Sequence, residues 1–218
     1  PLQPVIFLPP GDSYQGSFPS DDIDITRYGI DFVVRNGRAL VWPIIAGTHE
    51  RPRPRNRPTP AELVDRWRDV KGIRRKEIGA VIDFLEFAED FDGGKVALLA
   101  ASFGATFVSP HILVAEERIR AGVMMSATLA SVDTRRFPDI VNPNTYWPHV
   151  TQPILLLNGR YDISTHLIES RVAFLESIGA NSDTKRGIVY ESSHWPLPPH
   201  RVEKDVTDWL DAHLGPVD

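Results

Sequence analysis

Cysteine is absent from this chain, and its absence excludes several kinds of chemistry. Without thiols the protein has no disulfide bond, no thiolate nucleophile and no thiolate-ligated metal. The lack of cysteine does not, however, identify the redox compartment. The 7 histidines show no metal-ligand spacing with neighbouring acids. We therefore expect neither a zinc site nor any other metal.

Excess positive charge and long hydrophobic runs are also missing. The formal net charge is −5 at pH 7, so nothing in the overall charge attracts nucleic acid or anionic lipid. No apolar stretch approaches the roughly 20 residues of a membrane helix. The amino terminus, Pro-Leu-Gln-Pro, lacks the charged and apolar regions of a signal peptide. We expect no nucleic-acid partner and no membrane association, and we favour a cytoplasmic location without being able to assign one.

What the chain does contain is ordinary globular composition, with 42% hydrophobic and 24% charged residues. Its 218 residues suit one domain with a sizeable core, so we expect a single domain spanning 1–218. No internal repeat and no linker divides it. The first residue is proline, which is compatible with a processed chain or an excised domain.

Short apolar runs alternate with helical patterns along the chain, which predicts an α/β fold with a mostly parallel sheet covered by helices on both faces. Thr59-Pro60-Ala61-Glu62 carries the signals of a helix start: a cap, a proline and a glutamate. Pro43 within an apolar run indicates an edge strand or a bulge. The expected strands are 5–8, 39–45, 95–101, 121–125, 154–157 and 187–190, and the expected helices are 25–35, one from 59, an apolar stripe over 78–85, 167–178 and 202–210.

The most informative motif is Ala100-Ala101-Ser102-Phe103-Gly104, which joins an apolar run to a helix-compatible run. A nucleophilic serine on a sharp strand-to-helix turn needs small residues two positions before and after it. Ala100 and Gly104 meet this need. The alternative is a serine that merely caps a buried helix.

Acid and base candidates follow Ser102 in the chain. Asp162 comes after the run that ends at Leu157, and His194 comes after the run that ends at Tyr190. The order serine, acid, histidine is that of the α/β-hydrolases. Asp133, beyond the preceding strand, is an alternative acid, and His49 and His166 lie in loops that are candidates for substrate contact.

Further segments make the likeness specific. They are Val41 to Arg51, Asn142-Pro143-Asn144, Leu157 to Asp162, Tyr190 to His194 and Asp208 to Val217. With the serine motif, they resemble an α/β-hydrolase domain of the dienelactone-hydrolase and acetyl-esterase-like kind, particularly the hydrolase module at the carboxyl end of some bacterial serine/threonine-kinase-like proteins. Ser193 stands where that family leads us to expect glycine, and no proline follows the acid in 163–166.

The resemblance implies that the first edge strands of the fold are absent here or lie in a missing amino-terminal part, and it implies a fused or partner kinase-like domain. The short span between the strands 121–125 and 154–157 leaves room for a small cap or none. It also implies a catalytic triad of Ser102, Asp162 and His194 without any cofactor. The oxyanion would be held by the backbone N–H of Phe103 and by a second donor in the loop after the first strand. Pro9 and Pro10 have no N–H, which leaves Gly11, Asp12 or Ser13. We choose Asp12.

Substrate contacts are harder to assign. Tyr146, Trp147 and Trp195 are candidates for an apolar acyl or alcohol pocket, with core packing as the alternative. Arg51, Arg53, Arg55 and Arg57 form a loop that we interpret as solvated, although one arginine reaching a substrate carboxylate stays open.

We therefore predict a serine carboxylic-ester hydrolase that acts on small to medium ester substrates. A serine peptidase or amidase of the same fold shares these residues. A catalytically inactive hydrolase-fold module that binds a ligand or partner is the alternative from a different functional class.

Overall fold

Six parallel strands form one sheet in the computed structural model, in the order β2-β1-β3-β4-β5-β6. The structure describes residues 1–11, 19–51, 59–130, 138–162, 168–194 and 199–217. The strands are β1 (Pro4–Leu8), β2 (Ala39–Val41), β3 (Val96–Ala101), β4 (Ile119–Met125), β5 (Ile154–Gly159) and β6 (Lys185–Tyr190). Every neighbouring pair is parallel, so all six carboxyl ends lie along the same edge.

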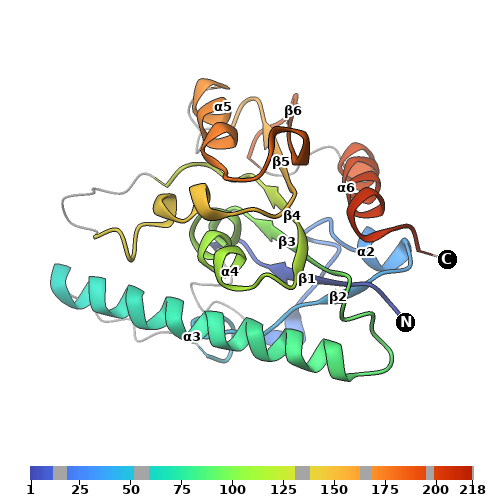
Figure 1. Cartoon of the computed structure of the whole chain (residues 1–218), viewed down its shortest axis with the longest axis horizontal. Coiled ribbons are helices and arrows are strands. Elements are labelled where there is room, and N and C mark those ends of the chain that lie inside the picture. Colours follow the sequence, from blue (N-terminus) through green and yellow to red (C-terminus); the bar gives the residue numbers. More distant parts are fainter. Residues whose placement is uncertain (12–18, 52–58, 131–137, 163–167, 195–198, 218) are drawn as a thin grey trace.

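Helices cover both faces of this sheet, as the sequence predicts (Figure 1). One face carries α3 (Pro60–Phe87), α4 (Ser109–Ala115) and α5 (Ile168–Ser177), and the other carries α2 (Phe32–Arg35) and α6 (Pro199–Leu214). Successive strand residues belong to opposite layers of the core: Leu98 and Ala100 face the first layer, and Leu99 and Ala101 face the second. This alternation explains why the central strands are largely unbroken apolar runs, since both of their faces are buried.

The long helix α3 begins where the sequence places a helix start. The Thr59 hydroxyl accepts from the backbone N–H of Glu62, whose carboxylate in turn accepts from the N–H of Thr59. Ile78, Ile82 and Leu85 form the buried stripe expected near its carboxyl end. The helix passes through Gly72 without interruption.

Two predicted boundaries are wrong near the amino terminus. Within 25–35 only Phe32–Arg35 is α-helical. Asp24 accepts hydrogen bonds from the N–H and hydroxyl of Thr26, and Gly29 has a φ of +61°, so a turn replaces the first part of that helix. The expected strand 39–45 ends at Val41. Pro43 interrupts the pattern, and β2 is an edge strand, in agreement with the edge interpretation.

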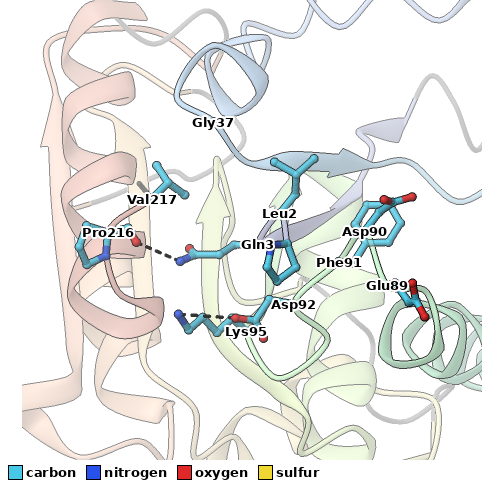
Figure 2. A pocket seen from close by; sticks show the side chains of 11 residues that line it. Leu2, Gln3, Gly37, Glu89, Asp90, Phe91, Asp92, Lys95, Pro216 and Val217 are labelled. Atoms are coloured by element: carbon cyan, nitrogen blue, oxygen red, sulfur yellow. Dashed lines mark hydrogen bonds and ion pairs between the residues drawn. The ribbon is translucent and has the colours of Figure 1, made fainter.

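A cavity of about 740 Å³ lies at the amino ends of the strands, where the two ends of the described chain meet (Figure 2). The Gln3 amide donates to the carbonyl oxygen of Pro216 over 3.3 Å, and Lys95 pairs with Asp92 at 3.5 Å. Ser102 follows the opposite, carboxyl end of β3. This cavity is therefore separate from the candidate active site.

Candidate active site

Ser102 occupies a sharp turn between β3 and a single turn of π-helix, η2 (Gly104–Val108). Its φ is +48°, in the left-handed region that a non-glycine residue rarely adopts. Its N–H continues the sheet by donating to the carbonyl of Met125 over 2.8 Å, while its own carbonyl accepts from Thr106 over 2.8 Å. The residue thus belongs to the strand on one side and to the helix on the other, and such strain is typical of functional sites.

We call the sharp turn at Ser102 the elbow. Gly104 makes it possible because the backbone at this position touches the loop after β1. A Cβ at Gly104 would lie 2.5 Å from the carbonyl oxygen of Leu8 and 2.6 Å from that of Pro9. The Gly104 N–H also donates to the Pro9 carbonyl over 3.2 Å. The small residue required by the motif is therefore required by backbone contact with a different strand.

The structure brings the three candidate catalytic side chains into one line. His194 Nε2 lies 2.9 Å from Ser102 Oγ, and His194 Nδ1 lies 2.6 Å from Asp162 Oδ2. The Asp162 side chain is fully buried, whereas that of His194 is 32% exposed. A buried carboxylate thus orients an imidazole whose other nitrogen faces a hydroxyl at the surface of the site. This is the geometry that transfers a proton from a serine nucleophile.

The loops carrying acid and base are held against each other by backbone contacts. A Cβ at Gly159 would overlap the carbonyl oxygen of Ser193 and lie 2.5 Å from that of Ser192. The N–H of Tyr161 donates to the same Ser192 carbonyl over 3.0 Å. Glycine at the end of β5 therefore lets the histidine loop cross directly over the strand that carries Asp162.

Ser126 contacts the loop that carries the candidate base, and sequence reasoning missed it. It follows β4, has a φ of +54°, and its N–H donates to the carbonyl of Leu157 over 2.7 Å. Its hydroxyl donates to the backbone carbonyl of His194 over 2.8 Å. The signal was available in principle, because Ser126 directly follows a predicted strand that neighbours β3 in a parallel sheet.

Arg171 on α5 is a second residue that the sequence did not single out. Its side chain is buried and donates to the carbonyl of Arg160 over 3.3 Å. Burial lowers the pKa of Arg171, and the negative charge of Asp162 opposes that shift. The buried guanidinium of Arg171 therefore interacts electrostatically with Asp162, the candidate acid.

The oxyanion side of the site is described in part. Phe103 directly follows Ser102, as the motif requires. A Cβ at Gly11 would lie 3.7 Å from the Cβ of Phe103, so the loop after β1 reaches the residue after the candidate nucleophile. Asp12 and Ser13 lie outside the described residues, and the choice of Asp12 stays a prediction.

Two of the three candidate substrate residues, Tyr146 and Trp147, lie elsewhere in the fold. Trp147 is fully buried and packs edge-on against Phe174 at 4.9 Å, so the core-packing alternative is correct for it. Tyr146 lines a different cavity, between α3 and α4. Trp195 lies outside the described residues.

A different aromatic group stands beside the elbow. Phe103 and Phe107 are stacked at 4.9 Å, and Trp67 of α3 lies 6.0 Å from Phe103 and 6.4 Å from Phe107. All three side chains are partly exposed. Together these three side chains form an aromatic wall. Phe103 and Phe107 are four residues apart, and this spacing could have indicated that they lie side by side. Nothing in the sequence around Trp67 indicates that it joins them.

The remaining candidates are placed as follows. His49 is buried, has a φ of +44° and packs its ring 5.9 Å from that of Trp42. Arg51 forms an ion pair with Glu77 and donates to the Ile44 carbonyl over 3.0 Å. Asp133, His166, Arg53, Arg55 and Arg57 lie outside the described residues.

The described part of the chain holds no group of three or more histidine, cysteine or acidic residues able to bind a metal ion. None of its helices is long and apolar enough to cross a bilayer.

Comparison with solved structures shows the fold. A cold-adapted esterase from an Arctic intertidal metagenomic library superposes with a TM-score of 0.67 at 16% identity, over 97% of this chain and 82% of that one. The Pyrococcus furiosus esterase PF2001 gives a TM-score of 0.69 at 16% identity, over 98% and 82%. An acetyl xylan esterase from Paenibacillus sp. R4 gives 0.66 at 15% identity, over 98% and 75%.

The chain therefore has the α/β-hydrolase fold of these esterases, as its sequence predicts. No protein-family model and no curated protein sequence matches it. At such low identity the structural likeness concerns the fold alone, so function has to be argued from the site.

Proposed function

We propose that this protein is a serine esterase that hydrolyses small to medium carboxylic esters through an acyl-serine intermediate. The observation that carries the proposal is the continuous line from Ser102 Oγ through the His194 ring to Asp162, with contacts of 2.9 and 2.6 Å. The serine stands on a strained turn whose packing holds it there. The solved structures described above are those of esterases, which agrees with this class of reaction.

In the first half of the reaction, Ser102 Oγ forms a bond to the substrate carbonyl carbon as its proton passes to His194 Nε2. The Asp162 carboxylate holds Nδ1–H and stabilises the imidazolium without taking its proton. The backbone N–H of Phe103 donates to the oxyanion of the tetrahedral intermediate. The bond from carbon to the alcohol oxygen then breaks, and His194 gives its proton to that leaving oxygen.

In the second half, His194 takes a proton from water, whose oxygen attacks the acyl carbon. Collapse of the second tetrahedral intermediate breaks the bond to Ser102 Oγ and returns a proton to it, releasing the carboxylic acid. Every proton moves between Ser102, His194, water and substrate. The reaction therefore needs no cofactor.

The wall formed by Trp67, Phe103 and Phe107 suits the apolar part of a substrate because it adjoins the proposed nucleophile. It replaces Tyr146 and Trp147 as our proposed substrate contact. Trp195 and a kinase-like partner domain stay predictions.

The test is hydrolysis of p-nitrophenyl acetate and butyrate, set beside hydrolysis of the matching p-nitroanilides. We expect ester turnover that falls by about 10³-fold or more in Ser102→Ala and Asp162→Asn. Ser177→Ala serves as the control, since that hydroxyl donates to the Phe174 carbonyl at the end of α5, away from the site. A fluorophosphonate should lose fluoride and form an Oγ–P bond at Ser102, which mass spectrometry locates.

Faster cleavage of the anilides than of the esters would replace the esterase with an amidase. If the intact protein shows neither ester turnover nor labelling at Ser102, the proposal fails in favour of a non-catalytic binding module. Full activity in Asp162→Asn would reject Asp162 as the acid while leaving the serine mechanism in place.

A further inference from the structure

A second cavity, of about 410 Å³, lies between the first half of α3 and α4. Arg68, Lys71 and Arg75 line it from α3 at intervals of three and four residues, so they share one face of that helix. His111 lines it from α4, and Tyr146 from the segment before β5. The cavity shares no lining residue with the Ser102 site.

The charge of this cavity is one-sided. Arg68, Lys71 and Arg75 line it and no carboxylate is among its described lining residues, although the exposed Arg68 also pairs with Asp65 at 2.9 Å. Lys71 is only 6% exposed, and within the described residues its ammonium donates to the Val141 carbonyl over 2.9 Å and lies over the Tyr146 ring. An ammonium has three N–H donors. A desolvated cation with one uncharged acceptor is costly unless an anion accompanies it.

His111 provides an independent sign that this cavity suits a polar ligand. The side chain is 5% exposed, yet neither ring nitrogen has a hydrogen-bond partner among the described residues. Burial, together with the nearby charges of Lys71 and two arginines, holds its pKa well below the ordinary histidine value. The ring is therefore neutral, with one N–H donor and one acceptor nitrogen, and buried polar groups of this kind normally have partners.

Apolar and aromatic surface completes the cavity. The half-buried Tyr146 ring lies 5.0 Å from Lys71 Nζ and 6.1 Å from the His111 ring. Val114 and Ile140 also line the space. The volume is in the range of small-molecule sites and far exceeds that of a single inorganic anion. The ligand that fits has an anionic group and an organic body.

We propose that this cavity is a binding site for a small phosphate monoester. The phosphate would lie between Lys71 and the arginine side chains, with His111 donating to one of its oxygens and Tyr146 packing on the organic part. A dianion is favoured over a carboxylate because the lining offers several cationic donors and a phosphate has three terminal oxygens that can accept from them. This proposal does not depend on the esterase mechanism.

Isothermal titration calorimetry of the whole protein with phenyl phosphate tests the proposal. We expect saturable binding at one site, weakened by about tenfold or more in Lys71→Met and in Arg75→Gln. Lys76→Gln is the matched control, because Lys76 is exposed on the same helix and does not line the cavity. Arg75 is exposed, so its replacement leaves folding intact even if Lys71→Met does not.

Benzoate and inorganic phosphate separate the two parts of the ligand. Benzoate binding as tight as that of phenyl phosphate would overturn the phosphate assignment. Inorganic phosphate should bind more weakly than phenyl phosphate, and equal affinity would refute the organic subsite. Absence of saturable binding, or equal weakening by Lys76→Gln and Arg75→Gln, would overturn the site itself.

Nuclear magnetic resonance of the histidine rings identifies where the ligand binds. We expect the ring nitrogen signals of His111 to shift with the dissociation constant found by calorimetry, while those of His194 stay unchanged. The signals are assigned by their loss in His111→Gln and His194→Gln. Movement of His194 instead would place phenyl phosphate in the esterase site and refute the proposal. None of these readouts requires turnover, so failure of the esterase assignment leaves them interpretable.

Discussion

Replacing Gly104 with alanine is the sharpest test of how the elbow is built. The added Cβ would lie 2.5 Å from the Leu8 carbonyl oxygen and 2.6 Å from the Pro9 carbonyl oxygen. Real Cβ contacts essentially never fall below 3.0 Å, so the chain must open by about 0.5 Å. Both obstructing atoms are backbone, at the end of a buried strand, and cannot move aside as a side chain would.

The expected cost follows from that displacement. Overpacking of this kind destabilises by about 1–3 kcal/mol. For a chain of this length each kcal/mol lowers Tm by roughly 3 °C, so Gly104→Ala should melt roughly 3–9 °C lower. The shift also moves Ser102 away from His194. A misplacement near 1 Å can cost about 10²-fold in rate, so we expect kcat/KM to fall by about 10- to 100-fold.

Gly72→Ala is the matched control, with the opposite expected sign. Gly72 lies within α3 and a Cβ there would have nothing within 4 Å. Alanine should stabilise the helix by about 0.5–1 kcal/mol and leave ester hydrolysis unchanged. Thermal unfolding and p-nitrophenyl butyrate kinetics on both variants decide the matter. A Gly104→Ala protein with parental Tm and parental kcat/KM would refute the claim that the elbow is fixed by contact with the β1 loop.

Three further predictions concern other parts of the molecule. Ser126→Ala removes the hydroxyl that donates to the His194 carbonyl, so kcat for ester hydrolysis should fall by about 10-fold while KM stays constant; a change in KM alone would contradict a positioning role. Burial lowers the pKa of Lys71 to about 8 from 10.5, so the unfolded chain binds more protons between these values. Stability relative to Lys71→Met should therefore rise by up to about 1 kcal/mol per pH unit from pH 8 to 10 in denaturant titrations, and a pH-independent difference would argue against a desolvated ammonium. Asp211→Ala leaves the buried Arg38 guanidinium without its 2.6 Å carboxylate partner and should cost about 1–3 kcal/mol in urea unfolding, whereas an unchanged midpoint would show that this pair adds nothing.

The strands were predictable because burial on both faces leaves a simple signal. Runs such as 154–157 are apolar at every position, and the observed β5 extends this run only to Gly159. At the sheet edge the signal weakens. Lys185 and Arg186 belong to β6 but were not predicted as strand, because an edge strand is partly exposed and accepts charged side chains.

The candidate site was predictable to the extent that it depends on chain order and strand ends. Ser102, Asp162 and His194 each follow a strand, and parallel strands deliver their carboxyl ends to one edge. The substrate wall was not predictable in the same way. Trp67 reaches Phe103 only because α3 packs beside the elbow, and Trp147 turns into the core for the same kind of tertiary reason.

Two close backbone approaches and one side-chain hydrogen bond connect the parts of the proposed site. Gly104 rests on the loop after β1, Gly159 lies under the histidine loop, and Ser126 after β4 donates to the backbone of His194. Each contact joins the end of one strand to the loop after another. The proposed nucleophile, acid and base are thus positioned by the sheet rather than by their own loops alone, which is how catalytic groups are kept within a fraction of an ångström of working geometry. It follows that variants at these glycines should change rate and stability together, while variants of exposed residues in the same loops should change neither.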